Sequence, residues 1–249
     1  MVITMQFEYI LMFWAILTFI DTTTVTWWIK HKNNILLPFG IMSASMFAVQ
    51  VFATKLSVWG FGIIAPSAII LYVDMLIISD IVNEKFGRKI AFSMALLSFI
   101  PGALMLGFGY LTTLFAEPSF ALTLGYNSIF AISLRIGLAS FIAFAIDYLF
   151  DTYVYAKLKM VYKGRKLYVR YLGAEIPTII LDSTIFITLA FIGTMPGTQL
   201  LTLIKSQMLM KYLLGIPAVL FMYYARWFLY KNPPLSNKVI IQNETIIEV

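Results

Sequence analysis

Long apolar segments separated by short polar ones run through the whole chain. Apolar stretches of about 20 residues recur, and this is the length that an α-helix needs to cross the hydrocarbon core of a bilayer. We predict seven such spans, at residues 9–28, 35–54, 61–82, 90–115, 129–150, 171–193 and 200–225. The strands of a membrane β-barrel would instead alternate apolar and polar positions in shorter segments. The pattern therefore predicts an all-α polytopic membrane protein with about seven transmembrane helices.

Basic residues fall mainly in every second polar segment. Loops 29–34, 83–89 and 157–170 and the segment from 226 onward hold two, three, six and three Lys and Arg residues, fourteen together. The alternate segments, 1–8, 55–60, 116–128 and 194–199, contain only Lys55. Because cytoplasmic loops are enriched in Lys and Arg, this distribution predicts an N-terminus outside the cell and a C-terminus in the cytoplasm. We therefore interpret the net charge of +6 as a topology signal, not as a surface for nucleic acid.

Composition narrows the possible chemistry. Hydrophobic residues make up 61% of the 249 residues and charged residues only 12%, whereas about a quarter of a soluble domain is charged. The chain has no cysteine, which excludes disulfides and Cys-based metal sites, and its single histidine, His31, lies in a short polar loop. The sequence contains no P-loop, nucleophile elbow or zinc-protease motif. We therefore expect neither an enzyme nor a bound cofactor or metal.

Ionisable residues within the spans are the candidate functional residues. Such a side chain costs roughly 3 kcal/mol at the centre of a span and usually faces the interior, a partner or a water-filled path. Asp182 and Lys211 lie near the middle of their spans, and Gln207 precedes Lys211 by one helical turn. Arg135 lies about 10 Å inside the outer end of its helix. Asp182 and Lys211 either touch a substrate or a coupling ion, or they pair with each other for structural reasons.

Other carboxylates have a structural interpretation beside a functional one. Asp80 and Glu84 lie one turn apart near the cytoplasmic end of their span, where Glu84 could form an interfacial ion pair with the basic residues that follow it. Asp147 and Asp151 are also one turn apart and could pair with the basic loop after them. Asp21 could be a lone polar packing residue beside three threonines. Spacing alone does not choose between these interpretations.

Four segments of the chain, in order, carry a resemblance to a known family. They are VFATKLSVWGFGIIAPSAIILYVDMLIISDIVNEKFGRK, RIGLASFIAFAIDYLFDTYVYAKLK, LYVRYLGAEIPTIILDSTIFITLAFIG and QMLMKYLLGIP. Together they resemble the signature motifs of the queuosine-precursor transporters, also called the vitamin uptake transporter family. The resemblance extends from about residue 36 to 226. The residues that carry it are Lys55, Asp80, Glu84, Gly87, Arg88, Lys89, Arg135, Asp151, Arg170, Asp182, Phe186, Gln207, Lys211 and Pro217.

The resemblance implies a transporter built on a six-helix core at residues 35–226. An extra transmembrane helix and basic loop at 1–34 would precede this core, and a cytoplasmic polar tail at 227–249 would follow it. The implied function is import of a 7-deazaguanine precursor of queuosine or archaeosine, such as preQ0, preQ1 or queuine, across the plasma membrane. Asp74, Asp147 and Glu175 depart from the family's pattern. The implied substrate-binding residues are Asp182, Lys211, Gln207, Arg135, Asp80 and Glu84.

The chemistry of such a substrate suits these residues. A guanine-like edge presents two parallel N–H donors and one carbonyl acceptor, O6. Asp182 could accept both N–H groups, while Lys211 or Gln207 donates to O6. Secondary transporters commonly bind their substrates near the membrane midplane, where these three residues are expected.

Two alternative functions remain open from the sequence. The chain could be the substrate-binding subunit of an ATP-driven vitamin importer, which would dock on its partner through a small-residue face such as Ala44 and Ala48. It could instead be an intramembrane enzyme that uses Glu175 and Asp182 as an acid pair. Seven residues along a helix place their Cα atoms about 10 Å apart, which is too far for a shared proton in a regular helix.

Overall fold

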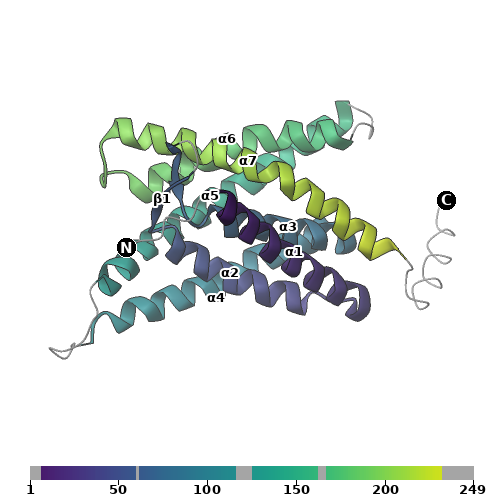
Figure 1. The fold of residues 1–249 in the computed structure, drawn as a ribbon, viewed down its shortest axis with the longest axis horizontal. Helices are drawn as coiled ribbons and strands as arrows, with labels where there is room; N and C mark the ends of the chain where they lie inside the picture. Colours follow the sequence, from purple (N-terminus) through teal and green to yellow (C-terminus); the bar gives the residue numbers. More distant parts are fainter. Residues whose placement is uncertain (1–6, 60–61, 116–124, 162–166, 232–249) are drawn as a thin grey trace. The chain divides into compact units, whose positions relative to one another are not determined.

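The computed structural model describes residues 7–59, 62–115, 125–161 and 167–231, and within them it has seven α-helices and one β-hairpin (Figure 1). Each helix overlaps one predicted span, whereas the tail beyond residue 231 lies outside the described residues. The helices are α1 (Phe7–Lys32), α2 (Leu36–Phe52), α3 (Ile69–Phe86), α4 (Arg88–Thr112), α5 (Tyr126–Val161), α6 (Leu167–Phe191) and α7 (Gly197–Tyr230).

The helices agree with the predicted class of an all-α membrane protein. In the part of the chain that the structure describes, α1, α4, α5 and α7 contain segments that are long and apolar enough to cross a bilayer. Water is absent from the hydrocarbon core, so a spanning segment has to satisfy its own backbone hydrogen bonds, and a helix does so. The number of crossings and the orientation of the chain stay predictions.

The predicted span 61–82 is wrong at its start, because a β-hairpin precedes α3. β1 (Leu56–Val58) pairs antiparallel with β2 (Ile64–Pro66). Gly62 has a φ angle of 74°, in the left-handed region that glycine tolerates. Pro66 lacks an amide donor and disfavours the helical conformation of the residue before it. The indole of Trp59 donates to the carbonyl of Ala65 (3.2 Å) and closes the hairpin.

Two predicted loops are mostly helical. In loop 83–89 only Gly87 separates α3 from α4; its φ is 85° and its N–H donates to the Asn83 carbonyl (2.9 Å). This is the left-handed residue with which helices commonly end. In loop 157–170, α5 continues to Val161 and α6 begins at Leu167. Residues 157–161 include neither glycine nor proline, the two residue types that most disfavour a helix, so α5 extends through them.

The chain divides into two compact units. The first unit comprises Met1–Ser45, Ile70–Ser98 and Gly215–Val249, and the second comprises Met46–Ile69 and Phe99–Leu214. In the first unit, the Trp14 indole on α1 donates to the Ile70 carbonyl at the start of α3 (3.1 Å). Near the other end of α1, Lys30 Nζ donates to the Phe228 carbonyl (2.7 Å), one of the carbonyls that the last turn of α7 leaves without an intrahelical donor. Helix α1 is therefore tied to both α3 and α7.

In the second unit, close approach between helices depends on small residues. Helix α5 packs against α6. A Cβ atom at Gly137 of α5 would lie 2.8 Å from Cδ1 of Leu106 on α4, so only glycine fits there without displacing that leucine. Ala139 and Ala143, two small residues four positions apart on α5, are both buried.

Candidate functional site

Asp182 and Lys211 face each other in the second unit. Asp182 lies on α6 and Lys211 on α7, and Lys211 Nζ donates to Asp182 Oδ2 in an ion pair. Each residue is only 6% exposed. One residue after Lys211, the hydroxyl of Tyr212 donates to the Ile176 carbonyl (2.9 Å). An ionic interaction and a neutral one, at positions six residues apart on α6, thus join α6 to α7.

The ion pair gives both residues a structural reason to be buried. An unpaired buried charge is strongly unfavourable, and an opposite charge in contact with it offsets much of the cost. The pairing alone therefore does not require that Asp182 or Lys211 touch a substrate. Their role in binding stays a prediction.

Two buried polar atoms next to the pair in sequence lack hydrogen-bond partners. Gln207, one turn before Lys211 on α7, is 4% exposed, and its Oε1 accepts no hydrogen bond. Ser183, which follows Asp182 on α6, is fully buried, and its Oγ has no partner either. Buried polar atoms are nearly always hydrogen-bonded, and a missing partner is often a water, an ion or a ligand. Gln207 and Ser183 are therefore the groups that a bound molecule would satisfy.

The sequence did not point to Ser183, nor to a third buried polar side chain of the same unit that has an atom without a hydrogen-bond partner. Gln50 on α2 is buried, and its Oε1 has no hydrogen-bond partner. Its Cγ lies beside Gly137, 3.9 Å from where a Cβ of that residue would be. The signal in the sequence was an amide side chain in an otherwise apolar part of a predicted span. Like a charged side chain there, it indicates a position that faces the protein interior or a functional site, although its transfer into the membrane costs less free energy.

Arg135 has a contact that the sequence did not predict. Its Nε donates to the Leu189 carbonyl (3.0 Å), and its Nη2 donates to the Ile192 carbonyl. These carbonyls lie at the C-terminal end of α6, where backbone acceptors lack intrahelical donors and a positive charge is favourable. Leu189 follows Asp182 by seven residues, so the guanidinium bonds about 10 Å further along α6. The structure joins Arg135 to the end of the helix that carries Asp182; a binding role for it stays a prediction.

Asp80 and Glu84 belong to the first unit. Glu84 Oε1 forms an ion pair with Arg226 Nε of α7 (3.3 Å), and the Tyr230 hydroxyl donates to the Glu84 carbonyl (3.3 Å). The sequence predicts, as the structural alternative, that Glu84 forms an ion pair with the basic residues that follow it on the chain. An ion pair does form, but with a residue from α7. Asp80 is half-buried one turn before Glu84, and substrate contact by either residue stays a prediction.

Comparison with known proteins adds to this geometry. A family model described as "Putative vitamin uptake transporter" matches residues 66–225. A protein of Bacillus subtilis (strain 168), described as "Probable queuosine precursor transporter", is 27% identical over 169 residues, which are 67% of this chain and 73% of that protein. No solved structure matches the chain. The span 66–225 includes all six candidate site residues and begins after α1 and α2.

Proposed function

The chain belongs to the family described as "Putative vitamin uptake transporter", and we propose that it is a plasma-membrane carrier that imports a 7-deazaguanine precursor of queuosine. The match over residues 66–225 carries this proposal. The printed name of the Bacillus subtilis relative supports the substrate class. The proposal includes preQ0, preQ1 and queuine as the substrates to be tested, and it assigns transport rather than catalysis to the chain.

The polar groups around Asp182 suit this substrate class. A carboxylate accepts two parallel N–H bonds, so Asp182 would bind the N–H pair of the guanine-like edge while it keeps its charge interaction with Lys211. Lys211, whose ammonium group has three N–H donors and pairs with Asp182, would donate to O6. Gln207 Oε1 is an acceptor without a donor, and a ring N–H of the substrate would supply it.

We further propose the arrangement of the chain in the membrane. Helix α1 would be an addition at residues 1–34 to a six-helix core at 35–226, with the tail 227–249 in the cytoplasm and the N-terminus outside. The support is the distribution of basic residues, which favours an odd number of spans. Cysteines introduced singly at Glu8 and Lys231 of this cysteine-free chain test the arrangement: a membrane-impermeant thiol reagent applied to intact cells should label only the first.

The experiment for function is uptake of labelled preQ0 in cells that cannot synthesise it. The unmodified protein should import the label and restore queuosine in tRNA. Import no faster than with an empty vector, for preQ0, preQ1 and queuine alike, would contradict the proposal. Purified protein in liposomes then separates a carrier from the binding subunit of an ATP-driven importer, because only a carrier transports without an ATPase partner.

A further inference from the structure

A second buried polar cluster lies in the first unit, and the proposed function does not use it. The carboxyl groups of Asp21 on α1 and Asp74 on α3 lie within hydrogen-bonding reach of each other, and the hydroxyl of Thr18 lies within reach of Asp74. Asp74 is 9% exposed. The interpretation of Asp21 as a lone packing residue is therefore wrong, and Asp74, which departs from the family's pattern, has a partner. We call this group the Asp21–Asp74 cluster.

A row of threonines continues the cluster along α1. Thr18, Thr22 and Thr26 follow one another at four-residue spacing, so they share one face of the helix, and each is at most 1% exposed. The opposite side of α1 is apolar and exposed, for example at Leu17 and Ile20. A helix that is polar inside and apolar outside is typical of one that faces a bundle interior or a water-filled path. The row extends for about 12 Å along the helix.

The hydrogen-bond partners of these threonines are unusual. Thr23 and Thr24 donate to the carbonyls four residues before them (2.7 and 2.8 Å), which is the common arrangement in a helix. Thr22 and Thr26 do not, and their hydroxyl oxygens have no partner although both are buried. Asp74 Oδ1 has no partner either. Three buried oxygen atoms of this unit are therefore open to waters or to a cation.

The closeness of the two carboxyl groups restricts their protonation states. An ionised carboxylate is only an acceptor, so a hydrogen bond between two carboxyl groups requires a proton on one of them. If both were ionised, their charges would repel strongly in a site with little water. Asp182 has Lys211 as its counter-charge, whereas the interactions of Asp21 and Asp74 among the described residues are with each other and with Thr18.

In the part of the first unit that the structure describes, the basic residues lie near the ends of the helices. The described part of α2 in this unit has no titratable side chain, and Arg88 and Lys89 lie at the very start of α4. The interactions that the structure gives for Asp21 and Asp74 involve none of the other titratable groups of these elements. Those groups are Glu8, Tyr9, Lys30, His31 and Lys32 on α1, Tyr72, Asp80, Glu84 and Lys85 on α3, Arg88 and Lys89 on α4, and Tyr223, Tyr224, Arg226 and Tyr230 on α7.

We propose that the Asp21–Asp74 cluster is a proton-binding site that couples the movement of H⁺ to transport, an inference that rests on the proposed function. One proton is held between the two carboxyl groups, and the hydroxyls of Thr22 and Thr26 line the route by which it enters or leaves. The proton that binds from one side is the proton released on the other, so the step needs no further reactant. Asp21 precedes the residues that match the family, so the pair is completed by a helix outside that match.

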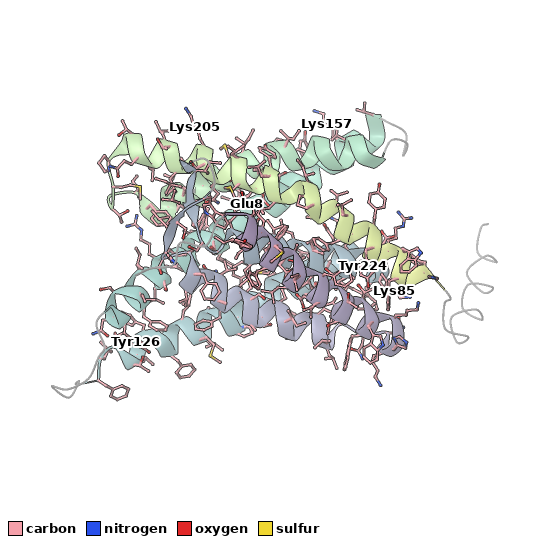
Figure 2. The ribbon with its side chains drawn as sticks, in the orientation of Figure 1. Glu8, Lys85, Tyr126, Lys157, Lys205 and Tyr224 are labelled. Carbon is pink, nitrogen blue, oxygen red and sulfur yellow. The ribbon has the colours of Figure 1, made fainter. Side chains whose placement is uncertain are left out.

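Purified full-length protein in liposomes tests the proposal with labelled preQ0. With acid outside, the unmodified protein should accumulate preQ0 above its external concentration, and a protonophore should abolish the excess. Asp74→Asn and Asp21→Asn should lose this accumulation but keep counterflow, the exchange of labelled for unlabelled preQ0 without a gradient. Glu8→Gln is the matched control, because Glu8 is an exposed carboxylate on the first turn of α1 (Figure 2), and it should accumulate normally.

The outcomes separate this inference from the proposed function. If the unmodified protein shows neither accumulation nor counterflow of any 7-deazaguanine, the proposed function fails. Infrared spectroscopy then tests whether the Asp21–Asp74 cluster binds a proton. The unmodified protein should show the C=O band of a protonated carboxyl group at neutral pH. This band should be lost in Asp74→Asn and in Asp21→Asn and retained in Glu8→Gln. Absence of that band in the unmodified protein overturns the proposal. Accumulation driven by a Na⁺ gradient and not by H⁺, or normal accumulation by the Asn variants, overturns it as well.

Discussion

Replacement of Asp182 by Asn tests the candidate substrate site. The amide keeps the size of the side chain and one acceptor oxygen, but an N–H₂ group takes the place of the other oxygen. One N–H of the substrate would then meet a donor. An unpaired buried polar group costs about 1–3 kcal/mol, which corresponds to a roughly 5- to 150-fold loss of affinity. We expect preQ0 binding by Asp182→Asn to weaken by this factor and uptake to fall with it.

The structure adds a second consequence, because Asp182 also balances the charge of Lys211. With both residues 6% exposed, the Asn variant removes the charge that Asp182 sets against the buried ammonium group of Lys211. Breaking a buried pair by removal of one partner costs about 3–5 kcal/mol of folding free energy. We therefore expect Asp182→Asn to lower the thermal unfolding temperature of the purified protein, and a loss of binding in this variant alone would not separate recognition from folding.

A double variant separates the two effects. Asp182→Asn combined with Lys211→Met removes both charges, so the unfolding temperature should recover relative to Asp182→Asn, while preQ0 binding should stay weak. Binding is measured by calorimetry on detergent-solubilised protein, and unfolding is followed on the same samples. If the double variant binds preQ0 as tightly as the unmodified protein, the ion pair is structural and the recognition of the base edge lies elsewhere.

Two further substitutions have matched controls on the same helices. Lys211→Met should lower both the stability of the protein and its affinity for preQ0, since it removes a donor and leaves Asp182 buried without a partner. Lys205→Met, at an exposed position of α7 (Figure 2), should change neither. Equal effects of the two substitutions would show that the burial of Lys211 does not matter. Thr22→Val should slow the proton-driven accumulation of preQ0 in liposomes. Thr24→Val should not, because the hydroxyl of Thr24 donates to the Ile20 carbonyl of its own helix. Equal rates for the two variants would show that the row of threonine hydroxyls is not part of the proton route.

The helices were predictable from the sequence because the bilayer restricts the possible structures so strongly. An apolar segment of about 20 residues has to be helical in the hydrocarbon core, so hydropathy alone locates most of each helix. Hydropathy does not distinguish an apolar helix from an apolar strand, and the hairpin before α3 was missed for this reason. Gly62 and Pro66 were the visible signals against a helix at that point.

The candidate site was predictable only in part. Asp182 and Lys211 were selected because a buried charge is costly, and their position near mid-span made a mutual contact plausible. The carbonyls that Arg135 binds lie 54 and 57 residues away in the chain, and no spacing rule connects such positions. Asp21 and Asp74 likewise come from different helices. Which face of each helix meets which neighbour is decided by packing, and a single sequence does not contain that information directly.

PreQ0 and preQ1 make different demands on the energy source of transport, because they differ in charge. PreQ0 carries a nitrile and is neutral, so the membrane potential does not act on it, and a bound proton has to supply the charge that is moved. PreQ1 carries an aminomethyl group and is a cation. One charge that crosses a potential of 100 mV gains about 2.3 kcal/mol, which sustains roughly 50-fold accumulation. In liposomes with an inside-negative potential, Asp74→Asn should therefore still accumulate preQ1 but not preQ0, provided that the unmodified protein transports both. Equal loss of both substrates would instead mean that Asp74 acts in folding or in substrate binding, and the Asp21–Asp74 cluster would no longer be the proton site.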